Sequence, residues 1–201
     1  MKILNNLKKI YKRKRLKKKN FTIISDNCWG NFMYQSVGIE YQSPFIGMFI
    51  YAEDYIRLLD NLDYYLKQEI VFIKHSKWEK QMPNRSIIGT YPIGVIGSDV
   101  EIHFLHYNDE EEVVSKWKRR LERMDMNNLY IKMSEKALCE KEHILKFDKL
   151  NFKNKVCFTK NEYPELKSCI FLEKTASEKF IQDEWKFQSK KFKFIKWINE
   201  G

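Results

Sequence analysis

Cys28 is the residue of this sequence best placed for nucleophilic chemistry. It follows the β-branched run Phe21–Ser25 and the turn residues Asp26 and Asn27, a pattern that predicts a strand, a turn and then a helix. The amides and the positive dipole at a helix start stabilise a thiolate, and ligands of open α/β sheets bind at the carboxyl ends of strands. The position favours a nucleophile, although most free cysteines are small core residues.

A cysteine nucleophile needs a base, and His106 is the best candidate. It ends the run Val100–His106, which predicts another strand, so both groups can face one cleft at a carboxyl edge. Asn108 or Asp109 can orient the imidazole as a third member of a triad. Asp109 is also explained as the N-cap of the next helix. The alternative bases are His75 and, on the opposite strand face, His103.

The helix expected over residues 109–124 carries an arginine cluster that can bind anions. Arg119 and Arg123 share a face, with Arg120 beside them. Guanidinium groups bind phosphate or carboxylate through two parallel hydrogen bonds, and sugar nucleotides and lipid-linked sugars carry such phosphates. The alternative is a solvated helix whose arginines pair with neighbouring glutamates.

Patterns that bind metals, nucleotides or dinucleotides do not occur in the sequence. The histidines and cysteines lack the HExxH spacing and paired-cysteine patterns of metal sites, and neither GxGxxG nor GxxxxGK[ST] occurs. We therefore expect no metal and no cofactor. The cysteines show no CxxC pair and no secretory signal precedes them, so we expect free thiols in a cytoplasmic protein: Cys28, Cys139, Cys157 and Cys169.

The net charge of +10 lies at the amino terminus. Residues 1–20 contain ten of the 37 basic side chains and no acidic one. Residues 21–201 therefore contain 27 basic and 27 acidic side chains and have no net charge. Apolar residues recur at helical spacing in residues 1–19 and predict a basic amphipathic helix, which suits an anionic membrane surface. A frayed chain end is the alternative. Nucleic acid is the least favoured partner, because the cations lie in an arm and not on a folded face.

Strand and helix patterns alternate along the rest of the chain, which predicts an α/β fold with a mostly parallel sheet flanked by helices. Residues 21–201 are expected to form one domain after the arm of residues 1–20. No run approaches the roughly 20 apolar residues of a spanning helix. The expected strands are Phe21–Ser25, Glu69–His75, Val100–His106, Leu129–Met133, Lys155–Thr159 and Cys169–Leu172, and the expected helices are Cys28–Val37, Ala52–Leu66, 109–124 and 137–147.

Several sequence strings resemble a bacterial domain of unknown function that is often labelled an exopolysaccharide biosynthesis protein. They run in order from about Phe21 to Leu172: Asn27-Cys-Trp-Gly30, Ser43-Pro-Phe45, Phe49-Ile-Tyr51, Glu53-Asp-Tyr55, His106-Tyr107, Lys116-Trp117 and Arg119-Arg120. The resemblance implies a role in capsule and surface-polysaccharide formation, and it defines no reaction.

The order of these motifs is also distantly similar to that of papain-like cysteine peptidases. That similarity implies Cys28 as the nucleophile and His106 as the base, with Asn27, Trp29 and Gly30 as orienting or binding residues. It supplies no third catalytic residue and no oxyanion partner beyond the amides at the helix start.

The leading hypothesis is a thiol-dependent acyltransferase or hydrolase that acts on surface glycans or their precursors through an acyl-enzyme. Its partners would be a sugar nucleotide, a lipid-linked glycan or an acyl donor. One alternative is a glycosyl- or phosphosugar-transferring enzyme that uses the arginine cluster. Another is a non-catalytic assembly factor, docked on the inner face of the cell membrane through residues 1–19.

Overall fold

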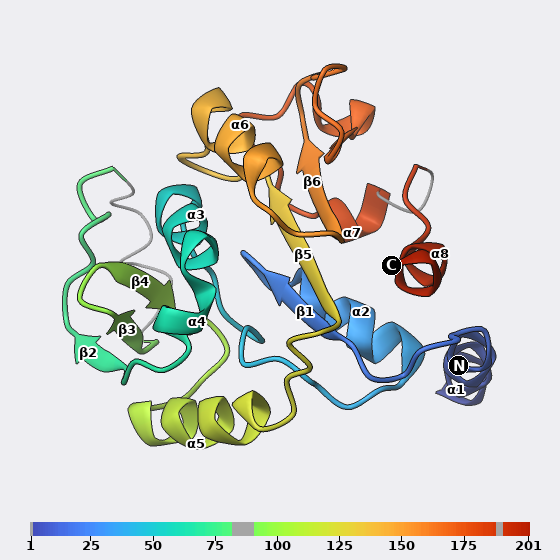
Figure 1. Ribbon diagram of the computed structural model, residues 1–201, viewed down its shortest axis with the longest axis horizontal. Helices are drawn as coiled ribbons and strands as arrows, with labels where there is room; N and C mark the ends of the chain where they lie inside the picture. The colour runs from blue at the N-terminus through green and yellow to red at the C-terminus, as the bar shows by residue number, and fades with distance from the viewer. Residues whose placement is uncertain (1, 82–90, 188–190) are drawn as a thin grey trace.

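A four-stranded parallel sheet forms the centre of the molecule (Figure 1). The computed structural model describes residues 2–81, 91–187 and 191–201. The sheet has the order β1-β5-β6-β7, and each neighbouring pair is parallel. The predicted α/β fold with a mostly parallel sheet is therefore confirmed. The strands are β1 (Thr22–Ser25), β5 (Leu129–Ser134), β6 (Lys155–Thr159) and β7 (Cys169–Phe171).

A second, antiparallel sheet lies beside the first and contains β2 (Val71–Ile73), β3 (Ile93–Ile96) and β4 (Val100–His103). The strand predicted to run to His106 therefore ends at His103, and it does not share the parallel sheet of β1. Strand β3 was not predicted, because its short run contains Gly94 and ends at Gly97. Gly97 and Ser98 have φ of +61° and +69°, and positive φ at two successive residues is a feature of type I′ turns, which are common in hairpins.

Helices cover both faces of the parallel sheet. Alternate strand residues point to opposite faces, so Ile23 packs in one hydrophobic cluster with side chains of α2 and α8, while Ile24 packs in the other with side chains of α3, α5 and α6. The helices are α1 (Lys2–Lys14), α2 (Trp29–Val37), α3 (Ala52–Asp60), α4 (Leu62–Tyr65), α5 (Glu110–Leu121), α6 (Lys141–Lys149), the 3-10 helix η2 (Glu173–Thr175), α7 (Glu184–Phe187) and α8 (Phe194–Glu200).

Local signals set most helix boundaries. Gly38 ends α2 in the left-handed conformation, with φ of 64°, as predicted. The helix predicted over Ala52–Leu66 is divided at Asn61, where φ of −137° breaks the helical backbone. The helix predicted over 137–147 begins later, at Lys141, after Leu138 takes a positive φ of 62°.

The basic amino-terminal segment forms helix α1, and the chain that follows it is tied to the domain. Leu16 is buried in the same hydrophobic cluster as α2 and α8. The Lys17 amide donates to Asn199 Oδ1 at 2.8 Å. No helix within the described ranges is long and apolar enough to cross a membrane.

Candidate active site at the carboxyl edge of the parallel sheet

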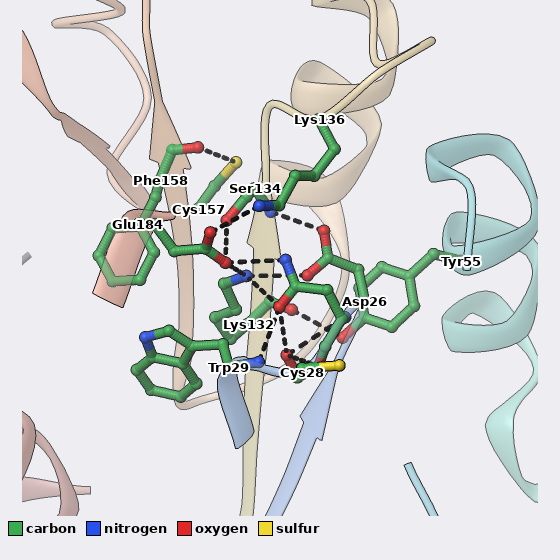
Figure 2. A network of polar contacts seen from close by, with 12 residues as sticks. Asp26, Cys28, Trp29, Tyr55, Lys132, Ser134, Lys136, Cys157, Phe158 and Glu184 are labelled. Atoms are coloured by element: carbon green, nitrogen blue, oxygen red, sulfur yellow. Dashed lines mark hydrogen bonds and ion pairs between the residues drawn. The ribbon is translucent and has the colours of Figure 1, made fainter. Parts of the chain in front are cut away.

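A buried polar network joins the ends of β1 and β5. Asp26, directly after β1, accepts a hydrogen bond from the Ser134 amide at Oδ2 (2.9 Å) and lies 2.9 Å from Lys132 Nζ at Oδ1. Lys132 also donates to Glu184 at the start of α7. All of these side chains are buried, and Figure 2 shows them converging above the strand ends. The network therefore fixes the segment that leads into α2.

The charges within the network balance. Lys136 Nζ lies 2.7 Å from Glu184 Oε2, so two lysines face two carboxylates. Burial alone lowers the pKa of Lys132, but the charges of Asp26 and Glu184 raise it above its ordinary value. Burial raises the pKa of Asp26. Burial opposes ionisation of Glu184 too, yet the two lysines lower the pKa of that carboxyl to about 2.

Asn27 connects the network to the start of α2. Its Oδ1 accepts from the Trp29 amide at 2.9 Å and from Lys132 Nζ at 3.0 Å, and its Nδ2 donates to Glu184 Oε1 at 2.7 Å. One predicted binding residue therefore has a positioning role, because it satisfies a first-turn amide of the helix. Its carboxamide fixes the backbone on either side of Cys28.

Cys28 is the N-cap residue of α2 and is partly exposed between buried neighbours. Its Sγ lies 3.8 Å from the Met48 carbonyl. The expectation that the helix start stabilises a Cys28 thiolate is wrong, because burial and then the charge of Glu184 raise the pKa of the Cys28 thiol to about 11. At neutral pH the thiol keeps its proton, so any nucleophilic role requires a base.

The adjacent loop residues Gly47 and Met48 contact the backbone of His106 and the thiol of Cys28, respectively. The His106 amide donates to the Gly47 carbonyl at 3.0 Å, and the Gly47 amide donates to Asn31 Oδ1 in α2 at 3.0 Å. Gly47 has φ of +75°, and a Cβ built there would lie 3.3 Å from His106 Cβ. His106 itself is exposed. Its side chain and Cys28 share no hydrogen bond within the described part of the chain.

Asn108 and Asp109 form hydrogen bonds with the first turn of α5. Asp109 Oδ1 accepts from the Glu112 amide at 2.8 Å, which confirms the predicted N-cap. The Asn108 amide donates to Glu112 Oε2 at 2.8 Å. Their polar groups are therefore engaged with α5, and the third member of a triad stays a prediction.

The structure does not bring the three arginines of α5 to one site. Arg120 is buried, donates to Tyr107 Oη at 2.6 Å and lies 5.2 Å from the centre of the Tyr41 ring. Arg123 Nη1 lies 2.7 Å from Glu40 Oε1, and Arg119 is exposed. Tyr107 in turn donates to the Ile46 carbonyl at 2.6 Å, so Arg120 supports the loop beside Cys28.

The remaining predicted binding residues lie in packed surroundings. Trp29 is fully buried, with its ring centre 6.0 Å from that of Phe158 and 6.2 Å from that of Trp197. A Cβ built on Gly30 would lie 3.5 Å from Ile23 Cγ2. Trp29 therefore fills the core in this conformation and offers no open face to a sugar ring.

The alternative bases lie with the antiparallel sheet. His103 is 2% exposed, with Nε2 2.7 Å from Glu101 Oε1 and Nδ1 3.2 Å from Tyr91 Oη. The side chain of His75 is 84% exposed and lies 3.4 Å from Glu79. Both imidazoles therefore have partners of their own.

Sequence reasoning missed the four residues that stabilise the carboxyl edge, namely Lys132, Ser134, Lys136 and Glu184. Lys132 does carry a signal, since a charged residue within the otherwise apolar strand Leu129–Met133 is buried only when it is paired. Nothing local marks Glu184. In residues 2–81, 91–187 and 191–201, no group of three or more histidine, cysteine or acidic side chains is arranged to hold a metal ion.

Comparison with known proteins places the chain in a family. A family model described as a domain of unknown function (DUF1919) matches residues 1–199. The chain is 32% identical over 196 residues to a Haemophilus influenzae protein described as uncharacterized, and the match covers 94% of this chain and 89% of that protein. The predicted resemblance to a bacterial domain of unknown function is confirmed. The exopolysaccharide label and the similarity to papain-like peptidases stay predictions.

Proposed function

The chain belongs to the DUF1919 family, described as a domain of unknown function. We propose that it is a thiol-dependent acyltransferase or hydrolase with Cys28 as its nucleophile. One observation carries the proposal. Cys28 Sγ lies 3.8 Å from the Met48 carbonyl, and the His106 backbone amide donates to the Gly47 carbonyl at 3.0 Å, so one loop contacts both the thiol and the backbone of the candidate base.

The high pKa of the thiol determines the form of the mechanism. A resting thiolate would require a lowered pKa, whereas burial raises that of Cys28 to about 11. The proton must therefore leave as the carbon–sulfur bond forms, and His106 accepts it as a general base. As the bond between the acyl carbon and the leaving oxygen breaks, His106 passes that proton to the leaving oxygen. A sugar hydroxyl or water then gives its proton to His106 and attacks the acyl-Cys28 thioester. The carbon–sulfur bond breaks, the acylated sugar or free acid leaves, and the sulfur takes the proton from His106 and becomes a thiol again.

The buried network supports this chemistry through position. Asn27, held by Lys132 and Glu184, bonds the Trp29 amide and so fixes the backbone around Cys28. A nucleophile on a fixed turn loses little entropy on reaching its attacking geometry. Asp26, Lys132 and Glu184 are too deeply buried to touch a substrate, and they act as positioning residues.

The substrate class comes from the sequence resemblance, which points to surface glycans or their precursors in exopolysaccharide or capsule formation. A cytoplasmic site would meet sugar nucleotides, lipid-linked glycans and acyl donors. The alternative of glycosyl or phosphosugar transfer through the arginines is less favoured, because Arg120 donates inward to Tyr107 and Arg123 pairs with Glu40.

The first test is acyl-enzyme formation with a small activated ester, p-nitrophenyl acetate. The full chain is mixed with the ester, p-nitrophenolate release is followed optically, and the acetylated peptide is identified by mass spectrometry. We expect an acetyl group on Cys28 and none on the buried Cys157. His106→Ala should slow Cys28 acetylation by about a hundredfold, the usual minimum for loss of a general base.

Two matched variants separate a specific base from a general effect. His75→Ala removes another exposed histidine, and Cys139→Ala removes another partly exposed thiol. Both should acetylate Cys28 at the wild-type rate. Acetylation of Cys28 that is equally fast in His106→Ala, or that occurs on Cys139 in preference to Cys28, would remove the basis of the proposed mechanism.

A further inference from the structure

Helix α1 turns its apolar stripe away from the protein. Leu7, Ile10 and Tyr11 are three and four residues apart, so they share one face of the helix. Their exposed fractions are 57%, 52% and 63%. In the described part of the chain, only four other large apolar residues are exposed, and these are scattered: Phe32, Tyr64, Val71 and Met126. A contiguous exposed stripe of this kind marks an interaction site.

The opposite face of α1 contacts the domain. Arg13 Nη1 donates to the Gly38 carbonyl at 3.5 Å, and a Cβ built on Gly38 would lie 3.7 Å from Lys9 Cβ. Lys9 and Arg13 are four residues apart, on the side of α1 away from Leu7. An amphipathic helix of a globular domain normally buries its apolar face, and α1 does the reverse.

The segment after α1 fixes this orientation. Leu16 is 5% exposed, and Asn199 of α8 bonds both the Arg15 carbonyl and the Lys17 amide, at 2.9 and 2.8 Å. Figure 1 shows α1 at the edge of the molecule, beside α2 and α8. The stripe is therefore presented outward by a helix that the fold holds in place.

The charges around the stripe indicate what kind of partner binds it. Lys8, Lys12 and Arg15 are exposed beside it, and residues 1–20 contain ten cations without an acid. A second copy docked on the same face would bring two such segments together, and like charges would repel. A bilayer of anionic phospholipids takes both the apolar side chains and the cations.

We propose that α1 docks the protein on an anionic phospholipid surface, with Leu7, Ile10 and Tyr11 inserted at the boundary between headgroups and acyl chains. The flanking cations contact headgroup phosphates. Because α1 is packed on α2 and the segment after it is bonded to α8, docking holds the whole domain in one orientation. This inference is independent of the chemistry proposed for Cys28.

The test is co-sedimentation of the full chain with lipid vesicles. We expect the chain to pellet with vesicles of phosphatidylcholine and phosphatidylglycerol, and to be released as salt screens the charges. The double variant Leu7→Ser and Ile10→Ser should bind these vesicles at least about tenfold more weakly, because it removes most of the inserted apolar area. Lys8→Gln with Lys12→Gln should weaken binding to vesicles with phosphatidylglycerol and leave the weak binding to phosphatidylcholine unchanged.

The matched control is Tyr64→Ser with Val71→Ser, which removes exposed apolar side chains (44% and 64%) away from α1. It should pellet like wild type, and circular dichroism should show every variant folded. Equal pelleting of the Leu7→Ser, Ile10→Ser variant and wild type would overturn the proposal. So would a wild-type dimer in light scattering that this variant converts to a monomer, with neither protein bound to vesicles, since the stripe would then be a contact between copies.

Discussion

Replacing Lys132 by methionine should destabilise the protein strongly, because Lys132 is the cation between two buried carboxylates. Its side chain is fully buried, its Nζ lies 2.9 Å from Asp26 Oδ1, and it also donates to Glu184. In Lys132→Met, Glu184 keeps Lys136 as a partner, whereas Asp26 keeps only its bond from the Ser134 amide. Loss of one partner of a buried ion pair costs about 3–5 kcal/mol, and we expect that loss in the free energy of unfolding at pH 7.

The pH dependence follows from the sign of the pKa shifts. Glu184 has its folded pKa lowered from 4.5 to about 2, so its charge contributes stability above pH 4.5 that is lost as the pH falls toward 2. That shift corresponds to roughly 3 kcal/mol. The pKa of Asp26 is raised by burial, so its ionisation costs stability as the pH rises above 3.8. Without Lys132 both carboxyl pKa values rise, and protonation relieves part of the loss.

The assay is urea unfolding followed by tryptophan fluorescence at pH 7 and at pH 5. Lys132→Met should lose less stability at pH 5 than at pH 7. The matched control is Lys146→Met, whose Nζ lies 2.8 Å from Glu142 with side chains 57% and 69% exposed. Its effect should stay within about 0.5 kcal/mol. A loss below about 1 kcal/mol in Lys132→Met, or an equal loss at both pH values, would refute the assignment of Lys132 as the compensating buried charge.

Two other changes test the loops around the site. Gly47→Ala should lower the free energy of unfolding by about 1–2 kcal/mol, because φ there is +75° and the new Cβ would meet His106 Cβ. The same variant should acetylate Cys28 more slowly. Wild-type values in both assays would contradict the role of this loop. Asp109→Ala should cost about 1 kcal/mol by removing the acceptor of the Glu112 amide. Thermal unfolding should show Asp109→Asn restoring most of that loss, and no loss in Asp109→Ala would exclude the cap.

Features that depend on a few neighbouring residues were predictable from the sequence. The unit of β1, turn and α2 was predicted from the run Phe21–Ser25, the polar turn and Gly38, and the structure has all three parts. The N-cap role of Asp109 was also predictable, since a capping side chain bonds an amide only three residues away. The parallel sheet followed from the alternation of strands and helices.

Boundaries were less predictable where the backbone changes direction inside an apolar pattern. The stripe over Ala52–Leu66 is continuous in sequence, yet the backbone at Asn61 divides the helix. Likewise, the alternation over Val100–His106 suits a longer strand, but the chain leaves the sheet after His103. Periodicity reports which residues are buried, and it does not fix where the hydrogen bonding of an element ends.

The sequence by itself determined the fold class, the charged arm and the position of Cys28 at a helix start, because each depends on local spacing and charge. Only the tertiary structure decided the state of that thiol. Burial and the carboxylate of Glu184, which reaches the site from α7, raise the pKa of Cys28, although Lys132 of β5 and Lys136 just after β5 act to lower it. Only the tertiary structure, too, turned the apolar stripe of α1 outward, because the contact of α1 with the end of α2 and the bonds of the following segment to α8 select which face of the helix is free.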